Sequence, residues 1–102
     1  KEVIVAATEH PNVDTLLNFA SFRTAYDVTI DALALKTIKT IMITAEGIPE
    51  RLARKLTVIA EKKKKTIIGP ATVGAITPGA FKTGNIGGCR NSIRTLCCCY
   101  RI

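Results

Sequence analysis

The stretch IIGPATVG, Ile67–Gly74, is a short apolar run that stops at a Gly-Pro pair and continues in small residues. Two earlier stretches follow the same pattern, LLNFAS at Leu16–Ser21 and IMITAEGIP at Ile41–Pro49. Continuous apolar runs of this kind are typical of parallel strands that are covered on both faces. The sequence therefore predicts three parallel strands, each followed by residues too small to fill a core.

Two amphipathic segments separate these runs and are predicted to be helices, Phe22–Leu35 and Gly47–Lys63. Ser21 is placed to cap the first helix. The lysines at Lys62–Lys65 end the second, where cations complement the helix dipole. The apolar stripes are Ala25, Val28, Ala32 and Leu35 in the first helix, and Ile48, Leu52, Leu56 and Ile59 in the second.

The alternation of strand and helix decides the fold class. Strands are expected at Val13–Phe19, Ile38–Thr44 and Thr66–Ile68, and the handedness of the crossovers requires them to be parallel. This βαβαβ unit is about half of a doubly wound sheet. The predicted class is α/β, a partial doubly wound, Rossmann-like parallel sheet flanked by helices.

The segments on either side of this unit fit the pattern less well. The opening KEVIVAA reads as one more strand, but only Thr8–Asn12 links it to Val13, which is too short for a parallel crossover. Either Lys1–Ala7 pairs differently or a crossover helix is missing. After Gly74 the sequence becomes loop-like, with a short hairpin expected around Pro78-Gly79.

Composition excludes several classes of protein. The chain is 47% apolar and 23% charged, as an ordinary globular domain is. Its net charge of +7 comes with two Tyr, three Phe and no Trp, so it has little aromatic surface on which bases could stack. No apolar run approaches the ~20 residues of a membrane helix. We therefore expect neither nucleic acid nor a membrane as a partner.

The four cysteines all lie near the end of the sequence, at Cys89 and Cys97–Cys99. Adjacent cysteines point their side chains apart, whereas zinc ligands are spaced as CxxC or similar. The one histidine, His10, is far away in sequence. We expect no metal site.

The predicted ligand site is the carboxyl edge of the sheet, where open α/β sheets bind ligands. Small residues allow a ligand to approach the backbone, and helix N-termini offer free N–H groups to an anion. No GxGxxG or Walker motif fixes which nucleotide binds, and glycine and proline also punctuate strands that bind nothing. The edge residues are Phe19, Ala20, Ser21, Ala45, Glu46, Gly47, Ile48, Pro49, Gly69, Pro70, Ala71 and Thr72.

Residues able to perform chemistry are scarce. Glu46 at this edge can accept a hydrogen bond from a ligand, although an exposed turn carboxylate is the commoner role. His10 precedes a strand, so it should lie at the opposite edge, and no Ser-His-Asp arrangement can be assembled. The residues alone indicate a binding module without a visible reaction, and no catalytic residue is predicted.

Several motifs, taken in order, resemble the ATP-citrate lyase family. They are HPNVDTLLNFASFRTAYD, IKTIMITAEGIPE, TIIGPATVG and PGAFKTGNIGG, which together cover about residues 9–88. The resemblance is to the part of the lyase that is homologous to the CoA-binding domain of the succinyl-CoA synthetase α subunit. That synthetase typically has asparagine and cysteine where Ala71 and Thr72 stand, which favours the lyase.

The resemblance implies an activity and a ligand. The family converts citrate, CoA and ATP into acetyl-CoA, oxaloacetate, ADP and phosphate, in the cytoplasm and as a homo-oligomer. CoA would bind at the carboxyl edge, whereas ATP and Mg²⁺ would bind in other parts of the enzyme. The residues that match the family at this edge are Phe19, Ala20, Ser21, Ala45, Glu46, Gly47, Pro49, Gly69, Pro70, Ala71 and Thr72.

The sequence also departs from the family. His10 is not the family's phosphorylated histidine, and the glycine-rich first turn of the CoA domain is missing. We therefore expect a fragment, inactive alone, with residues 1–88 forming part of the CoA-binding domain and residues 89–102 a divergent, poorly ordered tail with free thiols. The alternatives are a non-catalytic nucleotide- or CoA-binding fragment and a fragment of a succinyl-CoA ligase α subunit.

Overall fold

The structure is a computed structural model that describes residues 2–77 and 81–84. Helices and strands alternate along the first two thirds of the chain, and a hairpin follows them. The elements are α1 (Glu2–Glu9), β1 (Thr15–Asn18), α2 (Phe22–Ala34), β2 (Thr40–Ile43), α3 (Glu50–Lys62), β3 (Thr66–Ile68), β4 (Gly74–Thr77) and β5 (Phe81–Gly84).

The central sheet has the order β1-β2-β3, and both pairings are parallel. In register, Thr15 is level with Thr40, and Thr40 is level with Thr66. The predicted α/β class and the parallel arrangement of the three strands are thus confirmed. β3 has the predicted bounds, whereas β1 and β2 are each shorter at both ends than the predicted Val13–Phe19 and Ile38–Thr44.

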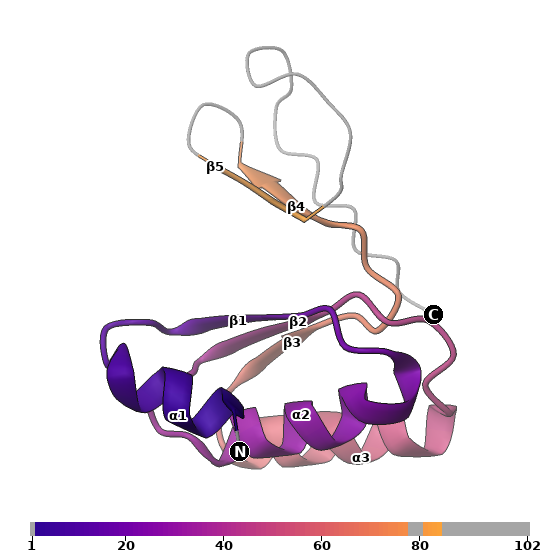
Figure 1. The fold of residues 1–102 in the computed structure, drawn as a ribbon. Coiled ribbons are helices and arrows are strands. Elements are labelled where there is room, and N and C mark those ends of the chain that lie inside the picture. The colour runs from indigo at the N-terminus through magenta and orange to yellow at the C-terminus, as the bar shows by residue number, and fades with distance from the viewer. Residues whose placement is uncertain (1, 78–80, 85–102) are drawn as a thin grey trace.

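The three helices all lie on one face of the sheet (Figure 1). Both crossovers run in the same direction across the sheet, so crossovers of one hand place α2 and α3 on the same side. These two helices contact each other, and α1 contacts α2.

The opening segment is helical, which corrects the reading of KEVIVAA as a further strand. In α1, Val3 and Ala7 are partly buried on one side, whereas Ile4 and Val5 are 43% and 55% exposed. A spacing of four residues brings Val3 and Ala7 onto one helical face. The helix stops before Pro11, as expected of a residue that precedes proline.

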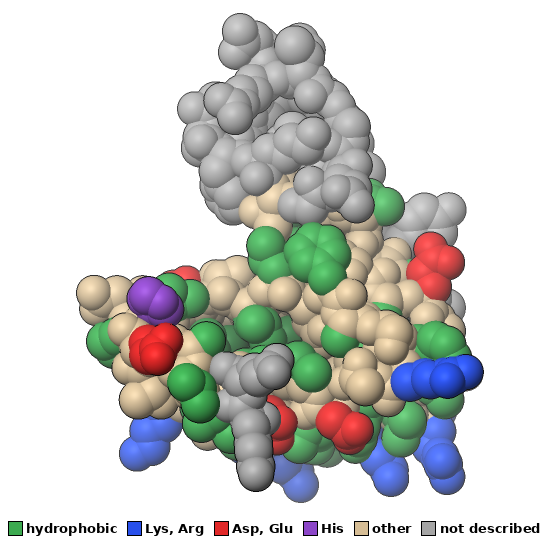
Figure 2. Space-filling view, viewed as in Figure 1, with side chains coloured by type: hydrophobic (Ala, Val, Ile, Leu, Met, Phe, Trp, Pro, Cys, Tyr) green, Lys and Arg blue, Asp and Glu red, His purple; other side chains and the backbone are tan. Residues whose placement is uncertain are grey.

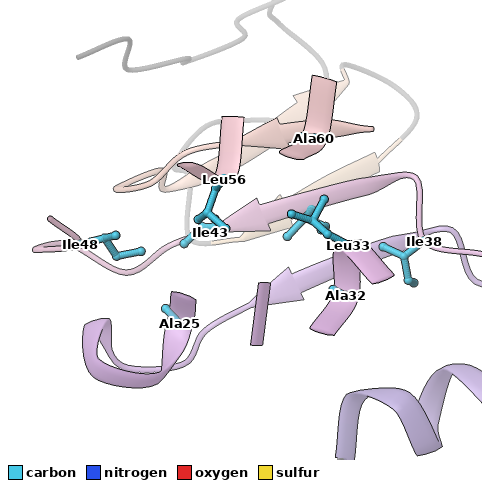
Figure 3. Close-up of a cluster of buried hydrophobic side chains, with 9 residues drawn as sticks. Ala25, Ala32, Leu33, Ile38, Ile43, Ile48, Leu56 and Ala60 are labelled. Carbon is cyan, nitrogen blue, oxygen red and sulfur yellow. The ribbon is translucent and has the colours of Figure 1, made fainter. Parts of the chain in front are cut away.

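The core lies between the sheet and the helix layer. Ile43 of β2 and Leu56 of α3 point toward each other, and Leu33 of α2 lies nearby (Figure 3). The predicted stripe of the second helix does face the core, with Leu56 buried and Leu52 and Ile59 packed against it. The predicted bounds Gly47–Lys63 are wrong at the start, because α3 begins only at Glu50, after Pro49, and ends at Lys62, so Ile48 joins the core from the turn before the helix. Lysine and arginine side chains gather along the outer side of the helix layer (Figure 2).

On α2 the predicted stripe is only partly right. Ala25 and Ala32 are fully buried, but Val28 is only partly buried, and Thr29 and Leu33 take the remaining core positions. Thr29 is accommodated in the core because its hydroxyl donates to the Ala25 carbonyl at 2.7 Å. Such a bond satisfies a buried hydroxyl.

A hairpin follows the sheet, as predicted. β4 and β5 pair antiparallel, with Gly74 level with Gly84 and Thr77 level with Phe81. Pro78-Gly79, around which the hairpin was expected, and the predicted tail at residues 89–102 lie outside the described residues. None of the described helices is both long and apolar enough to cross a bilayer.

Candidate functional site

The carboxyl ends of the three strands lie side by side at one edge of the sheet. Asn18 of β1 is level with Ile43 of β2. The turns beyond the strands are also joined, because the Ala71 N–H donates to the Ala45 carbonyl at 3.0 Å. The structure brings all the predicted binding residues to this edge. They are Phe19, Ala20, Ser21, Ala45, Glu46, Gly47, Pro49, Gly69, Pro70, Ala71 and Thr72.

The turn after β1 is held by the buried side chain of Asn18, which is 2% exposed. Its Nδ2 donates to the Ala25 carbonyl and to Thr29 Oγ1, both at 3.0 Å. Its Oδ1 accepts the Ala20 N–H at 3.0 Å. One carboxamide therefore joins the end of β1 to the first turns of α2, which fixes the backbone at the edge.

Asn18→Ala should lower the free energy of unfolding by about 2 kcal/mol, because it leaves the Ala20 N–H and buried groups of α2 without their partner. Urea unfolding followed by circular dichroism measures this loss. The exposed Asn12 is the matched control, and Asn12→Ala should change stability by less than about 0.5 kcal/mol. Equal stability of the two variants would contradict the proposed role of the Asn18 side chain.

The turn after β2 requires a glycine. Gly47 has φ +83°, and a Cβ at this position would lie 3.8 Å from Cγ of Phe22. The ring of Phe22 thus reaches across from the start of α2 to this turn. Beside it, Glu46 is exposed, as a turn carboxylate would be, and remains accessible to a ligand.

The turn after β3 runs closest to the neighbouring strand. Gly69 has φ +110°, and a Cβ there would lie 2.4 Å from the Ile43 carbonyl oxygen. Ala71 also has a positive φ, of 60°. Thr72 is 5% exposed, and its hydroxyl accepts the Gly74 N–H at 3.3 Å. Thr72 therefore supports the turn from inside, and its side chain is not available to a ligand.

The N-termini of α2 and α3 lie at this edge without side-chain caps. Ser21 occupies the N-cap position of α2, but its hydroxyl makes no capping hydrogen bond and instead lies 3.5 Å from Thr24 Oγ1. Ser21 thus lies at the predicted N-cap position, but the predicted capping hydrogen bond from its side chain is not made. Pro49 occupies the N-cap of α3 and has no side chain that could cap it. Uncapped first-turn N–H groups are suited to binding an anion.

Sequence reasoning missed two side chains at the start of α2. Phe22 is 49% exposed, and the guanidinium of Arg23 lies 5.7 Å from the centre of its ring. Both are accessible within the first turn of the helix. The signal was present in the sequence, because both residues directly follow the Phe19-Ala20-Ser21 turn. An arginine there adds a positive charge to the edge.

The described residues bring together no cluster suited to binding a metal ion. No group of three or more His, Cys, Asp or Glu side chains comes together among them. His10 follows α1 and lies before β1, at the opposite edge of the sheet, as predicted.

A hollow of about 330 Å³ lies elsewhere, between α1 and the start of β1. Its lining is almost entirely apolar, so it offers few groups that could orient a charged ligand. It shares no residue with the carboxyl edge. The lining residues are Val3, Ala6, Ala7, His10, Val13, Thr15, Leu16 and Ile38.

Proteins similar in sequence to this chain include ATP-citrate synthases from animals and fungi. No family model matches the chain. ATP-citrate synthase of Bos taurus is 55% identical over 93 residues, which are 91% of this chain and 8% of that protein. Probable ATP-citrate synthase subunit 1 of Neurospora crassa is 53% identical over 93 residues, 91% of this chain and 14% of that protein. The chain thus spans a small part of these relatives.

Solved structures agree with this result. ATP citrate lyase from Methanothrix soehngenii, in complex with citrate and coenzyme A, matches with a TM-score of 0.78 and 46% identity. The match covers 80% of this chain and 13% of that one. ATP citrate lyase from Methanosaeta concilii, in complex with (3S)-citryl-CoA, matches with a TM-score of 0.77.

The parallel sheet and the helix layer on one of its faces define a Rossmann-like α/β unit. Identity of 53–55% across most of the chain, together with the matching fold, makes the particular relationship clear. The chain is homologous to a short segment of ATP-citrate lyase, also called ATP-citrate synthase.

Proposed function

We propose that this chain forms part of the CoA-binding edge of an ATP-citrate lyase. The complete enzyme would make acetyl-CoA and oxaloacetate from citrate and CoA, with hydrolysis of ATP. One observation carries the proposal: three small-residue turns and two uncapped helix N-termini meet at one edge. Support comes from the Methanothrix soehngenii relative, which was solved with citrate and coenzyme A.

The edge suits the chemistry of CoA. CoA carries phosphate groups, and these would be attracted by the first-turn N–H groups of α2 and α3 and by Arg23. The turn at Gly69 has no side chain to keep a ligand from the backbone. The proposed binding residues are Phe19, Ala20, Ser21, Ala45, Glu46, Gly47, Pro49, Gly69, Pro70, Ala71 and Thr72, with Thr72 acting through the backbone.

The chain would bind and orient CoA without performing a chemical step. The described residues bring together no group of three or more His, Cys, Asp or Glu side chains that could hold a metal ion. In keeping with the family resemblance, ATP, Mg²⁺ and citrate would bind to other parts of the enzyme. We assign residues 1–88 to part of the CoA-binding domain and residues 89–102 to a separate tail. The partners would be the remaining domains of a homo-oligomeric cytoplasmic enzyme, and the chain alone would be inactive.

Ser21→Asp tests this proposal by placing a negative charge at the N-terminus of α2. We expect about tenfold weaker binding of CoA in isothermal titration, because the carboxylate repels the phosphates. Aspartate is a good N-cap residue, so the stability of the helix should be kept or improved. Binding and folding are therefore separated in this variant.

Asn12→Asp is the matched control, because it adds the same charge to an exposed residue before β1, at the opposite edge. It should leave CoA affinity unchanged. Equal weakening by both substitutions would mean that only net charge matters. An unchanged affinity in Ser21→Asp would place CoA elsewhere, and either result would contradict the proposal.

A further inference from the structure

The outer side of α3 carries three cations and one aliphatic side chain in a single row. The row consists of Arg51, Lys55, Val58 and Lys62, which are all exposed. Their successive spacings place them on one side of the helix, away from the core that α3 contacts through Leu56. We call this row the basic flank of α3. Lysine and arginine side chains line the outer side of the helix layer in Figure 2.

The charges of the basic flank are unfavourable for the helix itself. Arg51 and Lys55 lie one helical turn apart, and like charges at this spacing destabilise a helix. Arg51 also lies in the first turn of α3, where the positive end of the helix dipole disfavours a cation. Helix formation therefore does not account for this row of cations.

No carboxylate of the described residues neutralises the basic flank. The one ion pair among them joins Arg54 to Glu50 and includes none of the three cations of the row. The other acidic residue of α3, Glu61, directly precedes Lys62, and adjacent residues of a helix do not face each other. The sequence contains no acidic residue after Glu61. A partner that carries carboxylates would supply the missing negative charge.

An open hollow of about 310 Å³ lies within this surface. It is lined by Arg54, Lys55, Val58 and Ile59. The aliphatic stems of the two cationic residues can border an apolar seat while their charged ends stay in water. Val58 is 50% exposed there. The surface thus combines an apolar centre with a charged rim, as protein-binding patches do.

We propose that the basic flank of α3 is a docking site for an acidic segment of another polypeptide. One apolar side chain of the segment occupies the hollow, and its carboxylates pair with Arg51, Lys55 and Lys62. An arginine can hold a carboxylate through two parallel hydrogen bonds. The charges orient the segment, and the apolar anchor holds it in place.

Other anionic partners fit this surface less well. α3 contains no aromatic residue on which the bases of a nucleic acid could stack. Val58 is the one large apolar side chain of α3 that is exposed, which is too little apolar surface for insertion into a membrane. A second copy of the chain would be repelled by the net charge of +7. An acidic polypeptide uses both the cations and the hollow.

A synthetic peptide tests the proposal with the full chain. The probe is a fluorescein-labelled peptide in which glutamates flank a central Leu-Leu pair, and fluorescence anisotropy follows its binding. We expect saturable binding that Lys55→Glu weakens about tenfold. This substitution also removes the repulsion from Arg51, so the helix should be no less stable and the loss cannot come from unfolding. Lys55 is chosen because Arg51 lies in the first turn of α3, close to the proposed CoA site.

Lys36→Glu is the matched control, because it makes the same charge reversal at an exposed residue in the loop between α2 and β2. It should leave binding of the peptide nearly unchanged. A second peptide, with serines in place of the two leucines, should bind several-fold more weakly. Equal weakening by the two substitutions, equal affinity for the two peptides, or no saturable binding would overturn the proposal.

Three further measurements could assign the basic flank to a different partner. They are the binding of single-stranded oligodeoxythymidine, the binding of phosphatidylserine vesicles, and self-association in sedimentation equilibrium. We expect each to be weaker than binding of the leucine peptide and no more affected by Lys55→Glu than by Lys36→Glu. Tighter binding of any of these partners that only Lys55→Glu abolishes would overturn the proposal.

Discussion

Gly69→Ala is expected to lower the free energy of unfolding by about 3 kcal/mol. Gly69 has φ +110°, which side chains rarely adopt, and the new Cβ would lie 2.4 Å from the Ile43 carbonyl oxygen. That oxygen belongs to the backbone of the central strand, so it cannot move aside without disturbing the sheet. The turn after β3 should therefore distort, and urea unfolding should show the loss of stability.

Gly47→Ala is the control that separates backbone strain from the clash. Gly47 also has a positive φ, of 83°, but a Cβ there would meet only the ring of Phe22, at 3.8 Å. This is ordinary contact, so the loss should be about 1 kcal/mol from strain alone. Equal losses of stability in the two variants would mean that the short distance between residue 69 and the Ile43 carbonyl oxygen is not the reason why alanine is unfavourable there.

Leu56→Ala is the second substitution with a large expected effect. Leu56 is 2% exposed and packs against Ile43, so truncation should leave a cavity between α3 and the sheet. The expected loss is about 3 kcal/mol. For a domain of this size it corresponds to a fall in Tm of roughly 12–20 °C. The slope of the urea transition should stay the same, because the surface exposed on unfolding hardly changes.

Val58→Ala gives the comparison within the same helix. Val58 is 50% exposed on the outer side of α3, so its truncation should change stability by less than about 0.5 kcal/mol. A loss at Val58 as large as that at Leu56 would mean that the outer side of α3 is covered in solution. A negligible loss at Leu56 would contradict the described core.

The sheet and its two crossover helices could be predicted from the sequence because each local signal agreed with the global fold. The apolar runs, which end in small residues, marked the strands, and β3 was predicted with its observed bounds. α2 begins at the predicted Phe22. The parallel arrangement was predicted from the alternation of strands and helices and from crossover handedness.

The parts that could not be predicted depend on tertiary contacts. Val3, Ile4 and Val5 are β-branched, but they lie in the helix α1, whose Val3 packs against the core. Thr29 is absent from the predicted apolar stripe, yet it is buried because Asn18, eleven positions earlier, provides a buried partner for its hydroxyl. Helix propensity and hydrophobic periodicity describe one segment at a time, so they cannot predict contacts between segments that are distant in sequence.

The candidate site was predictable in its place but not in its detail. Parallel strands bring their carboxyl ends to one edge, which was enough to collect the turns after β1, β2 and β3. The inward position of the Thr72 side chain depends on the backbone angles of its turn. The placement of Phe22 and Arg23 depends on which way the first turn of α2 faces. These are set by close contacts that no short motif specifies.

The central claim is that CoA binds at the carboxyl edge of the sheet. The most direct measurement is a titration of the ¹⁵N-labelled chain with CoA, followed by backbone amide shifts in NMR. We predict that the shifts concentrate in the turns after β1, β2 and β3, with the amides of Ser21, Gly47 and Gly69 among them. Shifts centred on the hollow beside α1, or no shifts at millimolar CoA, would contradict the account.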